Sequence, residues 1–398
     1  MKNSSWKNRM KIILLSIAGV LLAACAILFT ASGIFSAPKY LEPWQKSYSN
    51  KFSDARIKLA AHGILAANGH NMQPWKIKLD ADKNVFYLYA DSERLAKEVD
   101  PFARQTMVTQ GTFLEYVRIA AEKLGYKTDM VLFPDGEYDE QNLAESIKNK
   151  PVAKITLTKA ESRQNSLYDF MFLPDTNRAA YQKTQLTSDE IKQLQAINTD
   201  PDMTIKIFQD EENKKRLGKY AIEGAKIESG IHRMNVESAN IFRSNEYEKN
   251  KYRYGFSVEG QGTTGLMKHV MQGLVTLFPS INSEKSSADL YVKSTQTAVD
   301  NTAAYALIIT KGNNRIEQVK SGMLYSRLIL TAHSIGFVMQ PPSQVLEEYP
   351  EMKEQYSGIH SDYAPKGSTI QMFVRMGKPT KEFPQTMRRD VMELIDIG

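Results

Sequence analysis

The sequence contains a single cysteine, Cys25, among 398 residues. One cysteine excludes an intrachain disulfide framework and any metal site built from several cysteines. The six histidines show neither the HExxH arrangement nor another ligand spacing, so the sequence predicts no metal. The signatures of a Ser/His/Asp triad and of paired carboxylates are also missing, so no side chain is singled out as a catalytic acid, base or nucleophile.

A concentrated run of positive charge is lacking from the main part of the chain. The formal net charge is +6, and four basic residues fall within residues 1–11, which leaves +2 for the rest. A protein that binds nucleic acid requires a basic face. We therefore expect no nucleic-acid partner.

Residues 12–36, in contrast, form a long apolar run. About 20 apolar residues suffice to cross a bilayer as a helix, and the basic tail 1–11 favours a cytoplasmic N-terminus. The pattern predicts a single-pass membrane anchor, with the main domain outside the cytoplasm. Residues 37–53 are expected to be a linker whose Trp44 and Tyr48 lie at the membrane interface.

Two processing sites compete with an uncleaved anchor. Leu22-Ala23-Ala24-Cys25 has the form of a lipoprotein cleavage box, and residues 34–37 have the form of a signal-peptidase site. However, the apolar run continues through residues 26–29, and Pro38 would directly follow the second cut. We favour the uncleaved anchor.

The stretch Asn68-Gly69-His70-Asn71-Met72-Gln73-Pro74-Trp75 organises the sequence that follows the linker. It joins a helix-like segment, which Asn68-Gly69 would end, to an alternating segment at 76–79 that is typical of a strand. Its two amides can donate and accept hydrogen bonds at once, as a polyol or the edge of a heteroaromatic ring requires. The alternative is a turn whose Trp75 only caps the core.

This stretch resembles the first flavin-contact motif, Asn-x-Gln-Pro-Trp, of the nitroreductase superfamily. The form that begins at His70 is closest to the Acg-type FMN-binding oxidoreductases, in which one chain carries two related halves. The resemblance implies an α+β fold in which the halves 54–160 and 161–398 form an intramolecular pseudo-dimer behind the N-terminal transmembrane helix. It also implies FMN as the cofactor.

The pattern of the remaining sequence predicts a series of elements. They are a hairpin at 76–79 and 85–90, a helix at 104–124, a strand at 128–133, helices at 189–197 and 213–233 with the latter continuing through 234–242, a polar linker at 280–288, a strand at 303–310, a helix at 318–334, an extended segment at 337–344, a strand at 368–377 and a final helix that carries Arg388 and Arg389. Both long apolar helices end at a glycine, Gly125 and Gly336, which supports an internal duplication.

Residues 174–181 predict a helix start beside an arginine. Thr176 and Asn177 are capping residues, and backbone N–H groups together with Arg178 would form a phosphate cradle. The alternative is an ordinary helix cap with a solvated arginine. The segment resembles the Acg-type phosphate segment, and the first half has no counterpart to it, which implies one flavin per chain.

The resemblance assigns the remaining site residues. Arg375 matches a second phosphate-binding position, and Gln340, Ser343 and Gln344 lie on a segment that passes the reactive edge of the flavin, largely through backbone groups. From the first motif, His70, Asn71, Gln73 and Trp75 are expected at the ring and its polar edge. For His70, a proton donor and a satisfied turn histidine are both open.

The glycine-rich stretch 252–278 suits a mobile cover over a pocket, and equally a plain loop followed by a short helix. The function that we expect is an FMN-dependent, nitroreductase-like oxidoreductase with NAD(P)H or another donor and a small nitroaromatic or quinone-like acceptor. The alternatives are a protein that holds or sequesters FMN without turnover and a protein with an empty, degenerate pocket. The sequence names neither the acceptor nor the oligomeric state.

Overall fold

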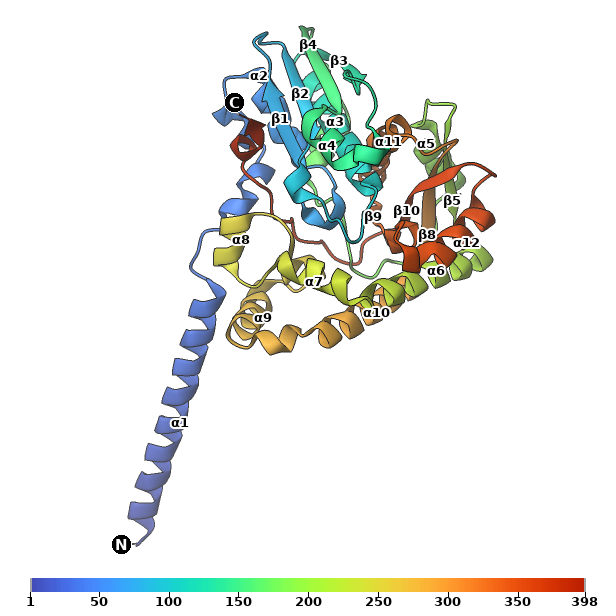
Figure 1. Ribbon diagram of the computed structural model, residues 1–398. Helices are drawn as coiled ribbons and strands as arrows, with labels where there is room; N and C mark the ends of the chain where they lie inside the picture. Colours follow the sequence, from blue (N-terminus) through green and yellow to red (C-terminus); the bar gives the residue numbers. More distant parts are fainter. Residues whose placement is uncertain (1, 397–398) are drawn as a thin grey trace.

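One helix, α1 (Lys2–Ser32), stands away from the rest of the chain (Figure 1). The computed structural model describes residues 2–396. The apolar part of α1, Trp6–Ser32, is 27 residues long, and none of its most apolar stretch is buried. The prediction of a long apolar helix is therefore confirmed, and its length and composition suffice to cross a membrane.

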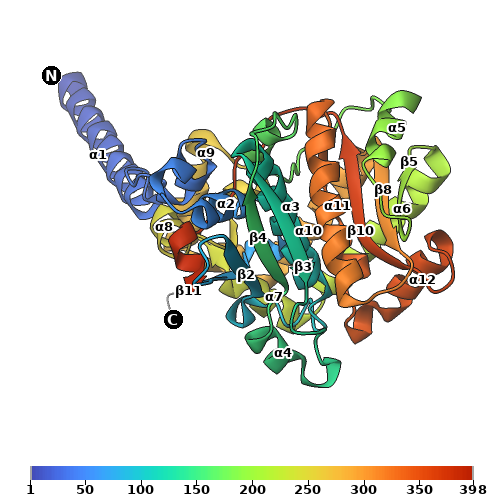
Figure 2. The same ribbon diagram turned by 90° about the horizontal axis from the view of Figure 1, so that it is seen from above.

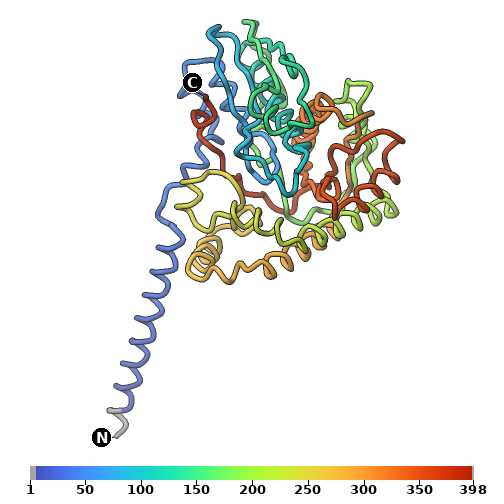
Figure 3. The backbone as a smooth tube through the Cα atoms, in the orientation of Figure 1, coloured from blue at the N-terminus to red at the C-terminus, as the bar shows by residue number. Residues whose placement is uncertain are grey.

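The first sheet has the strand order β11-β1-β2-β4-β3. Its strands are β1 (Trp75–Leu79), β2 (Val85–Ala90), β3 (Tyr126–Leu132), β4 (Ala153–Lys159) and β11 (Ile395–Asp396). The neighbouring pairs are antiparallel except for β1 and β11, which run parallel with Ile77 opposite Ile395. The C-terminal segment thus returns to the first strand of the chain (Figure 3). The predicted hairpin is confirmed.

The second sheet is antiparallel, with the order β5-β8-β10-β9. Its strands are β5 (Met203–Phe208), β8 (Ala304–Thr310), β9 (Val338–Gln340) and β10 (Thr369–Gly377). All residues of β8 and β10 are buried, which explains the nearly continuous apolar sequence of β8. A parallel pair of short strands, β6 (Phe242–Arg243) and β7 (Phe256–Ser257), lies outside both sheets.

Helices surround the two sheets and separate them, which confirms the α+β class. They are α2 (Ala55–Gly63), α3 (Arg104–Lys123), α4 (Leu143–Asn149), α5 (Ser188–Ala196), α6 (Glu211–Ser229), α7 (His232–Asn240), α8 (Glu246–Tyr252), α9 (Gly265–Leu277), α10 (Glu284–Asp300), α11 (Arg315–Ser334) and α12 (Lys353–Tyr363). The predicted helices at 104–124, 189–197 and 318–334 are confirmed. The predicted helix 213–242 is two helices, because the chain turns after Ser229 at Gly230.

Helices α3 and α11 lie side by side between the two sheets (Figure 2). Each places a glycine against the backbone of the other: a Cβ atom on Gly111 would overlap the carbonyl oxygen of Val319, and a Cβ atom on Gly322 would overlap that of Val108. The contact is reciprocal, since each glycine is the eighth residue of its helix and each valine the fifth. The two helix backbones approach as closely as glycine permits.

The segment 174–181 is not a helix start, contrary to the prediction. Its backbone groups pair with distant segments instead: the N–H of Asn177 donates to Met339 O over 2.9 Å, and the N–H of Tyr181 donates to Asn301 O over 3.1 Å. Tyr181 also forms a β-bridge with Pro379. These pairings hold the segment extended, so the capping residues have no helix to cap.

The predicted linker 280–288 is wrong as well. It contains the short 3₁₀ helix η8 (Pro279–Asn282) and the start of α10, whose first turn Ser283 caps by accepting from the N–H of Ser286. The mostly polar, exposed surface of α10 hides its helical period in the sequence.

The predicted final helix around Arg388 and Arg389 is an extended segment that leads into the 3₁₀ helix η11 (Val391–Leu394). Residues 37–53 are folded onto the main domain: they form η1 (Lys39–Trp44) and η2 (Tyr48–Lys51), and Trp44 and Tyr48 are buried within the protein. The indole N–H of Trp44 donates to Thr386 O over 2.8 Å, and the hydroxyl of Tyr48 accepts from the N–H of Val391 over 3.0 Å. Both aromatic residues therefore hold the C-terminal segment.

The contact between α3 and α11 predicts that Gly111→Ala and Gly322→Ala each lower the free energy of unfolding by roughly 2–3 kcal/mol, because a methyl group forces the two backbones apart. Denaturant unfolding followed by circular dichroism measures the effect. Gly260→Ala is the control, since Gly260 has only the Ser257 hydroxyl within 4 Å. Equal stability of all three variants would show that the helices tolerate separation.

Candidate functional site

The turn at residues 69–73 adopts an unusual backbone conformation. His70, Asn71 and Gln73 have φ values of 52°, 51° and 51°, in the left-handed region that costs a non-glycine residue roughly 1–2 kcal/mol. Such strain persists only where surrounding contacts fix it, and it is often found at functional sites. The strained backbone therefore makes the turn a candidate for a functional site.

The amides of the turn are bonded to the protein itself. Asn71 Nδ2 donates to Gly255 O over 3.2 Å and to Met387 O over 3.1 Å. Gln73 Nε2 donates to Arg253 O over 2.9 Å, and Gln73 Oε1 accepts from the N–H of Arg389 over 2.8 Å. The two amides thus join the turn to residues 253–255 and 387–389 and do not face an open space.

Trp75 lies fully buried in the core of the first half. Its indole N–H donates to Thr109 O over 3.1 Å, and its ring centroid lies 5.2 Å from that of Phe113. These contacts are those of a core residue. In this structure the side chains of Trp75, Asn71 and Gln73 are all engaged in contacts within the protein.

His70 is the residue of the turn whose side chain is left without a hydrogen-bond partner. Its Nδ1 atom is buried and has no partner among the described residues, and its ring centroid lies 5.3 Å from that of Phe256. Burial, and secondarily the charge of Arg178, lowers the pKa of His70 to about 4. The imidazole is therefore neutral at pH 7 and lies close to Arg178.

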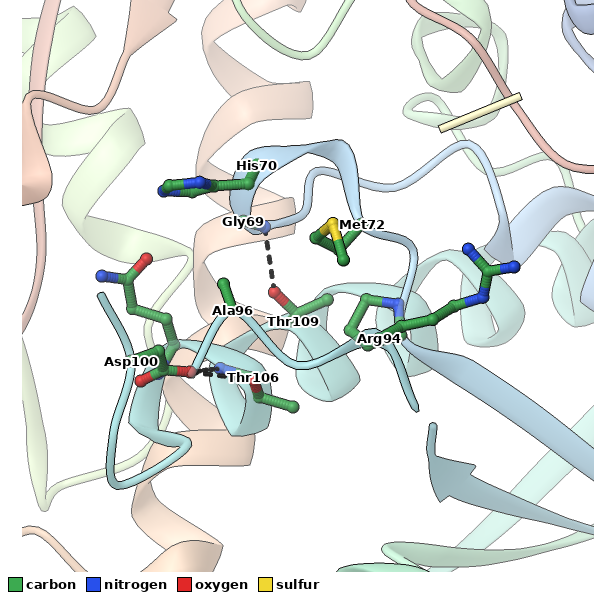
Figure 4. A pocket seen from close by; sticks show the side chains of 10 residues that line it. Gly69, His70, Met72, Arg94, Ala96, Asp100, Thr106 and Thr109 are labelled. Atoms are coloured by element: carbon green, nitrogen blue, oxygen red, sulfur yellow. Dashed lines mark hydrogen bonds between the residues drawn. The ribbon is translucent and has the colours of Figure 1, made fainter. Parts of the chain in front are cut away.

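A cavity of ≈ 20 Å³ adjoins the turn (Figure 4). It is lined by Gly69, His70, Met72, Pro74, Arg94, Ala96, Asp100, Gln105, Thr106 and Thr109. Figure 4 shows Thr106 and Thr109 of α3 on its wall, with the N–H of Gly69 donating to Thr109 Oγ1 over 3.3 Å. This volume holds about one water molecule, whereas ligand pockets measure on the order of 300–1,000 Å³.

A larger cavity of ≈ 450 Å³ lies elsewhere, against the segment that follows α1. Residues 37–45 and Gln385 line it, and it includes none of the residues that the sequence predicted for a flavin. Its size falls within the range of ligand pockets. We find no unpartnered buried polar atom among its lining residues.

Arg178 stands out among the buried and partly buried arginines. It is partly buried, and its guanidinium forms no hydrogen bond or ion pair within residues 2–396. Burial lowers its pKa, and the groups close enough to affect it are Asp175, Tyr181, Tyr291 and Tyr325. A partly buried cation without a partner is costly unless an anion binds it, so Arg178 is the residue best suited to a phosphate.

The neighbours of Arg178 in the sequence have structural roles. Asn177 is buried, donates through Nδ2 to Lys381 O over 3.1 Å and caps the N–H of Ala179. The hydroxyl of Thr176 donates to Asp175 Oδ2 over 2.9 Å. Thr176 therefore stays near the arginine, while Asn177 fixes the extended segment.

The guanidinium of Arg375 is already bonded within the protein. Its guanidinium donates to Gln340 Oε1 over 2.7 Å, to Ala179 O over 2.8 Å, and to the carbonyl oxygens of Asn177 and Ala298 over 3.4 Å. It also stacks on the ring of Tyr181 at 3.9 Å. Arg375 and Gln340 thus hold β10 and β9 against the extended segment, and their side chains are less available to a phosphate than that of Arg178.

The two arginines of the C-terminal segment are bonded within the protein through their terminal nitrogens, whereas the buried Nε atom of each has no hydrogen-bond partner among the described residues. Arg388 donates to Asn71 Oδ1 over 3.0 Å, Leu65 O over 3.1 Å and Asp175 Oδ1 over 3.2 Å. Arg389 donates to Gln73 O over 3.2 Å and Glu393 O over 2.9 Å. Both tie the C-terminal segment to the turn.

A cluster of buried polar groups that sequence reasoning missed lies next to Arg178. Glu228 of α6, Glu347 and Tyr349 each carry a buried oxygen without a partner among the described residues. All three, together with Arg178, lie close enough to Tyr291 of α10 to influence its phenol. Burial raises the pKa of Glu228 to about 7 and that of Glu347 well above the usual range, so at pH 7 the carboxyl group of Glu347 favours its protonated form while that of Glu228 lies near its midpoint.

Ser343 and Gln344 lead into this cluster. They begin the 3₁₀ helix η9 (Ser343–Leu346), and the Gln344 side chain bonds to Glu228. Gly224 of α6 lets η9 approach closely, since a Cβ atom there would lie 3.0 Å from Val345 N. The cluster comes from elements far apart in sequence, and no motif signals it.

The residues fit one end of an FMN better than the other. Arg178 suits its phosphate, and the unpartnered Nδ1 of His70 and the buried, unpartnered hydroxyl of Tyr325 suit polar atoms nearby. The cavity beside His70 is too small for a flavin ring. A flavin ring bound beside His70 would therefore need more space than this cavity offers.

Comparisons with known proteins give a partial likeness. No protein-family model matches the chain. The chain is 25% identical over 133 residues to the "Probable NAD(P)H nitroreductase PigM" of Serratia sp. (strain ATCC 39006), a match that covers 33% of this chain and 36% of that protein. The similarity thus spans about a third of the length of the relative.

Similar solved structures belong to the same class. A nitroreductase-like family protein from Bacillus cereus matches with a TM-score of 0.33 at 13% identity, over 60% of this chain and 99% of that one. An FMN-bound nitroreductase from Bacteroides fragilis matches with a TM-score of 0.34 at 10% identity, over 57% and 96%. At these scores the overlaps carry no argument about the site.

The buried imidazole of His70 predicts a pH dependence of stability. In the folded chain it titrates near pH 4, and in the unfolded chain near pH 6.5. Between these values the unfolded chain binds more protons, so the stabilisation is complete above about pH 6.5 and is lost as the pH falls towards 4. The imidazole accounts for up to about 3 kcal/mol of the difference in unfolding free energy between high and low pH. We expect His70→Asn to reduce this difference, measured by urea unfolding at pH 4.5 and pH 7.

Asparagine is chosen because it tolerates the positive φ of the turn. The control is His232→Asn, at an exposed histidine, which should leave the pH dependence nearly unchanged. A His70 variant with the same pH dependence as the parent protein would show that the imidazole is solvated.

Proposed function

We propose that the protein is a membrane-anchored, FMN-dependent oxidoreductase of the nitroreductase-like class. In this proposal it transfers hydride or electrons from a reduced donor to a small acceptor, such as a nitroaromatic or quinone-like compound. The observation that carries the proposal is Arg178, a partly buried cation without a protein partner in the described chain, beside unpartnered polar atoms. A phosphate binds such a guanidinium through charge-assisted hydrogen bonds. The partial similarity to a protein named as a probable NAD(P)H nitroreductase supports nitroreductase-like chemistry with NAD(P)H as the donor.

We further propose that residues 54–160 and 161–398 are related halves that form a pseudo-dimer within one chain. The reciprocal glycine contacts of α3 and α11 support a two-fold relation, because equivalent positions of two helices of 20 residues meet each other. The return of β11 to the first sheet supports an exchange of strands between the halves. The site then lies where the halves meet, with His70 from the first and Arg178 from the second.

The cofactor supplies the redox chemistry when it is bound, and the protein supplies position and electrostatics. Arg178 neutralises the phosphate. The neutral imidazole of His70 and the hydroxyl of Tyr325 offer hydrogen bonds in a site with little water. The protonated carboxyl group of Glu347 is a hydrogen-bond donor in the cluster around Tyr291 that also includes Arg178.

A second candidate function is an FMN-holding protein without turnover. The observation that favours it is the use of the Asn71 and Gln73 amides inside the protein, together with the small cavity at His70. Both features leave little room for an acceptor beside a flavin. Bleaching of bound flavin by NAD(P)H distinguishes an enzyme from a holder.

We propose that α1 anchors the protein uncleaved, with its N-terminus in the cytoplasm and the main domain on the other side of the membrane. The basic side chains Lys7, Arg9 and Lys11 at its start support this orientation. The exposure of its apolar side chains supports insertion into lipid.

The phosphate assignment predicts that Arg178→Ala weakens FMN binding about 10- to 100-fold, the factor that corresponds to a charge-assisted hydrogen bond of about 1.5–3 kcal/mol. The measurement is the absorbance spectrum and FMN titration of the detergent-purified full chain. Riboflavin, which lacks the phosphate, should bind the variant and the parent protein equally.

Arg163→Ala is the matched control, since Arg163 is exposed. Full FMN affinity of the Arg178 variant would refute the phosphate assignment. A parent protein that neither carries nor takes up flavin would refute the proposed function as a whole.

The proposed orientation predicts that a reporter protein active only in the cytoplasm is silent when it is fused to the C-terminus through a flexible linker, and active when it is fused to the N-terminus. Fluorescence of whole cells measures both. A fluorescent C-terminal fusion would show that the orientation is opposite to the one proposed. A mature chain that begins at Cys25 would show that the protein is a lipoprotein instead.

A further inference from the structure

Exposed apolar side chains gather beside the end of α1. Outside α1, the described chain exposes fourteen large apolar residues, and six of them lie between residues 266 and 290, on α9, η8 and α10. Their exposed fractions are Leu266 65%, Met267 58%, Leu277 39%, Phe278 55%, Ile281 44% and Leu290 61%. We call these six residues the α9–α10 patch. Soluble monomers rarely concentrate exposed apolar side chains in this way.

The patch is held firmly against the main domain. On the inner side of α9, Lys268 pairs with Glu246 over 3.1 Å and with Glu259 over 3.0 Å, and Gln272 Nε2 donates to Glu246 over 2.9 Å. The carboxylate of Glu246 also accepts from the hydroxyl of Tyr40 over 2.8 Å. These buried polar contacts fix which face of α9 points outward, so the apolar face is a property of the fold.

A different side of α9 packs on α1. Gly273 lies against the backbone of Leu28, where a Cβ atom would overlap the Leu28 carbonyl oxygen. Ser32 Oγ and His269 Nδ1 lie 3.4 Å apart, within hydrogen-bond distance. Figure 1 shows α9 next to the end of α1, with α10 on the same side of the domain from which α1 projects.

The contact with Leu28 sets the depth of α9 relative to the bilayer that α1 is proposed to cross. A helix needs about 20 residues to cross the hydrocarbon core of a bilayer, and Ile12 is the first residue after the basic tail. The hydrocarbon then ends near Ala31, so Leu28 lies about 5 Å inside it, at about 1.5 Å of rise per residue. A helix that touches the backbone of Leu28 lies at the boundary between hydrocarbon and headgroups.

We infer that α9, η8 and the first half of α10 form a second membrane contact, whose apolar side chains insert into the boundary of the bilayer that α1 crosses. The inference rests on the proposed anchoring by α1 and is independent of the proposed flavin chemistry. The chemistry is that of an interfacial amphipathic helix, which buries its apolar face roughly 5–10 Å into the headgroup boundary. The exposed aromatic rings of Phe35 and Tyr247 flank the same end of α1, where amphipathic and aromatic side chains accumulate in membrane proteins.

The single native cysteine makes a direct test possible. The full chain is placed, one copy per lipid nanodisc, with an environment-sensitive fluorophore on one cysteine, and quenching by nitroxide-labelled lipids is measured. The labelled cysteine is Cys25 in the parent protein, and Met267→Cys or Phe278→Cys in a Cys25→Ser background. Val131→Cys is the matched control, since Val131 is an apolar residue of β3 that is 48% exposed and lies away from α1 (Figure 1).

We expect nitroxides near the headgroups to quench the labels at residues 267 and 278 several-fold more than the label at 131. Equal quenching at 267, 278 and 131, with Cys25 quenched, overturns the inference while the anchor stands. A Cys25 label that no nitroxide lipid quenches refutes the anchoring, and the inference falls with it. Aqueous iodide provides the complementary measurement, because labels held in lipid are protected from it and labels in water are not.

Discussion

The backbone contact between α3 and α11 fixes the relation of the two sheets. Because Gly111 and Gly322 have no side chain, the helices meet with carbonyl groups against α-carbons, and no side chain between them can rotate or be compressed. Each helix then carries part of the site: α3 carries Thr109 next to the turn, and α11 carries Tyr325 next to Arg178. The distance between α3 and α11, which only glycine permits, therefore sets the relative positions of Thr109 and Tyr325.

The C-terminal segment is the second determinant of the site. It crosses from β10 to the first sheet, and its carbonyl groups and arginines accept or provide most of the bonds that the Asn71 and Gln73 side chains make. The strained φ values of the turn cost a few kcal/mol in total, and these bonds offset that cost. The side chains that a sequence motif assigns to a ligand are thus also those that fasten the end of the chain.

Local sequence signals predicted the elements that have a clear period and a clear stop. The hairpin at 76–90 and the helices that end before Gly125 and Gly336 belong to this group, because alternation and a positive φ at glycine are local properties. Helix α10 was not predicted, because most of its surface is polar and exposed. Only a narrow stripe of the helix packs against the domain, and this stripe cannot be recognised in the sequence without the structure.

The site was predictable only in part, because it too depends on contacts between residues far apart in the sequence. Arg178 and Arg375 both matched phosphate-binding positions of the resembled family, and what separates them is their hydrogen-bond partners: the segment 177–181 and Ala298 surround Arg375 with carbonyl oxygens and the ring of Tyr181, whereas Arg178 has no such partners in the described chain. The carboxyl groups of Glu228 and Glu347 meet through the packing of α6 on η9, which depends on Gly224. The two carboxyl groups come close only through the tertiary fold, and the spacing of the residues in the sequence does not predict it.

The pairing of Ile77 with Ile395 imposes an order of events during synthesis. The chain emerges from the ribosome N-terminus first, so β1 and β2 are available long before their parallel neighbour β11 exists. Until β11 is released, β1 remains an open edge, and open edges pair readily with other chains. Completion of the first sheet therefore waits for β11, and any nascent or truncated chain that lacks β11 exposes an edge that favours aggregation.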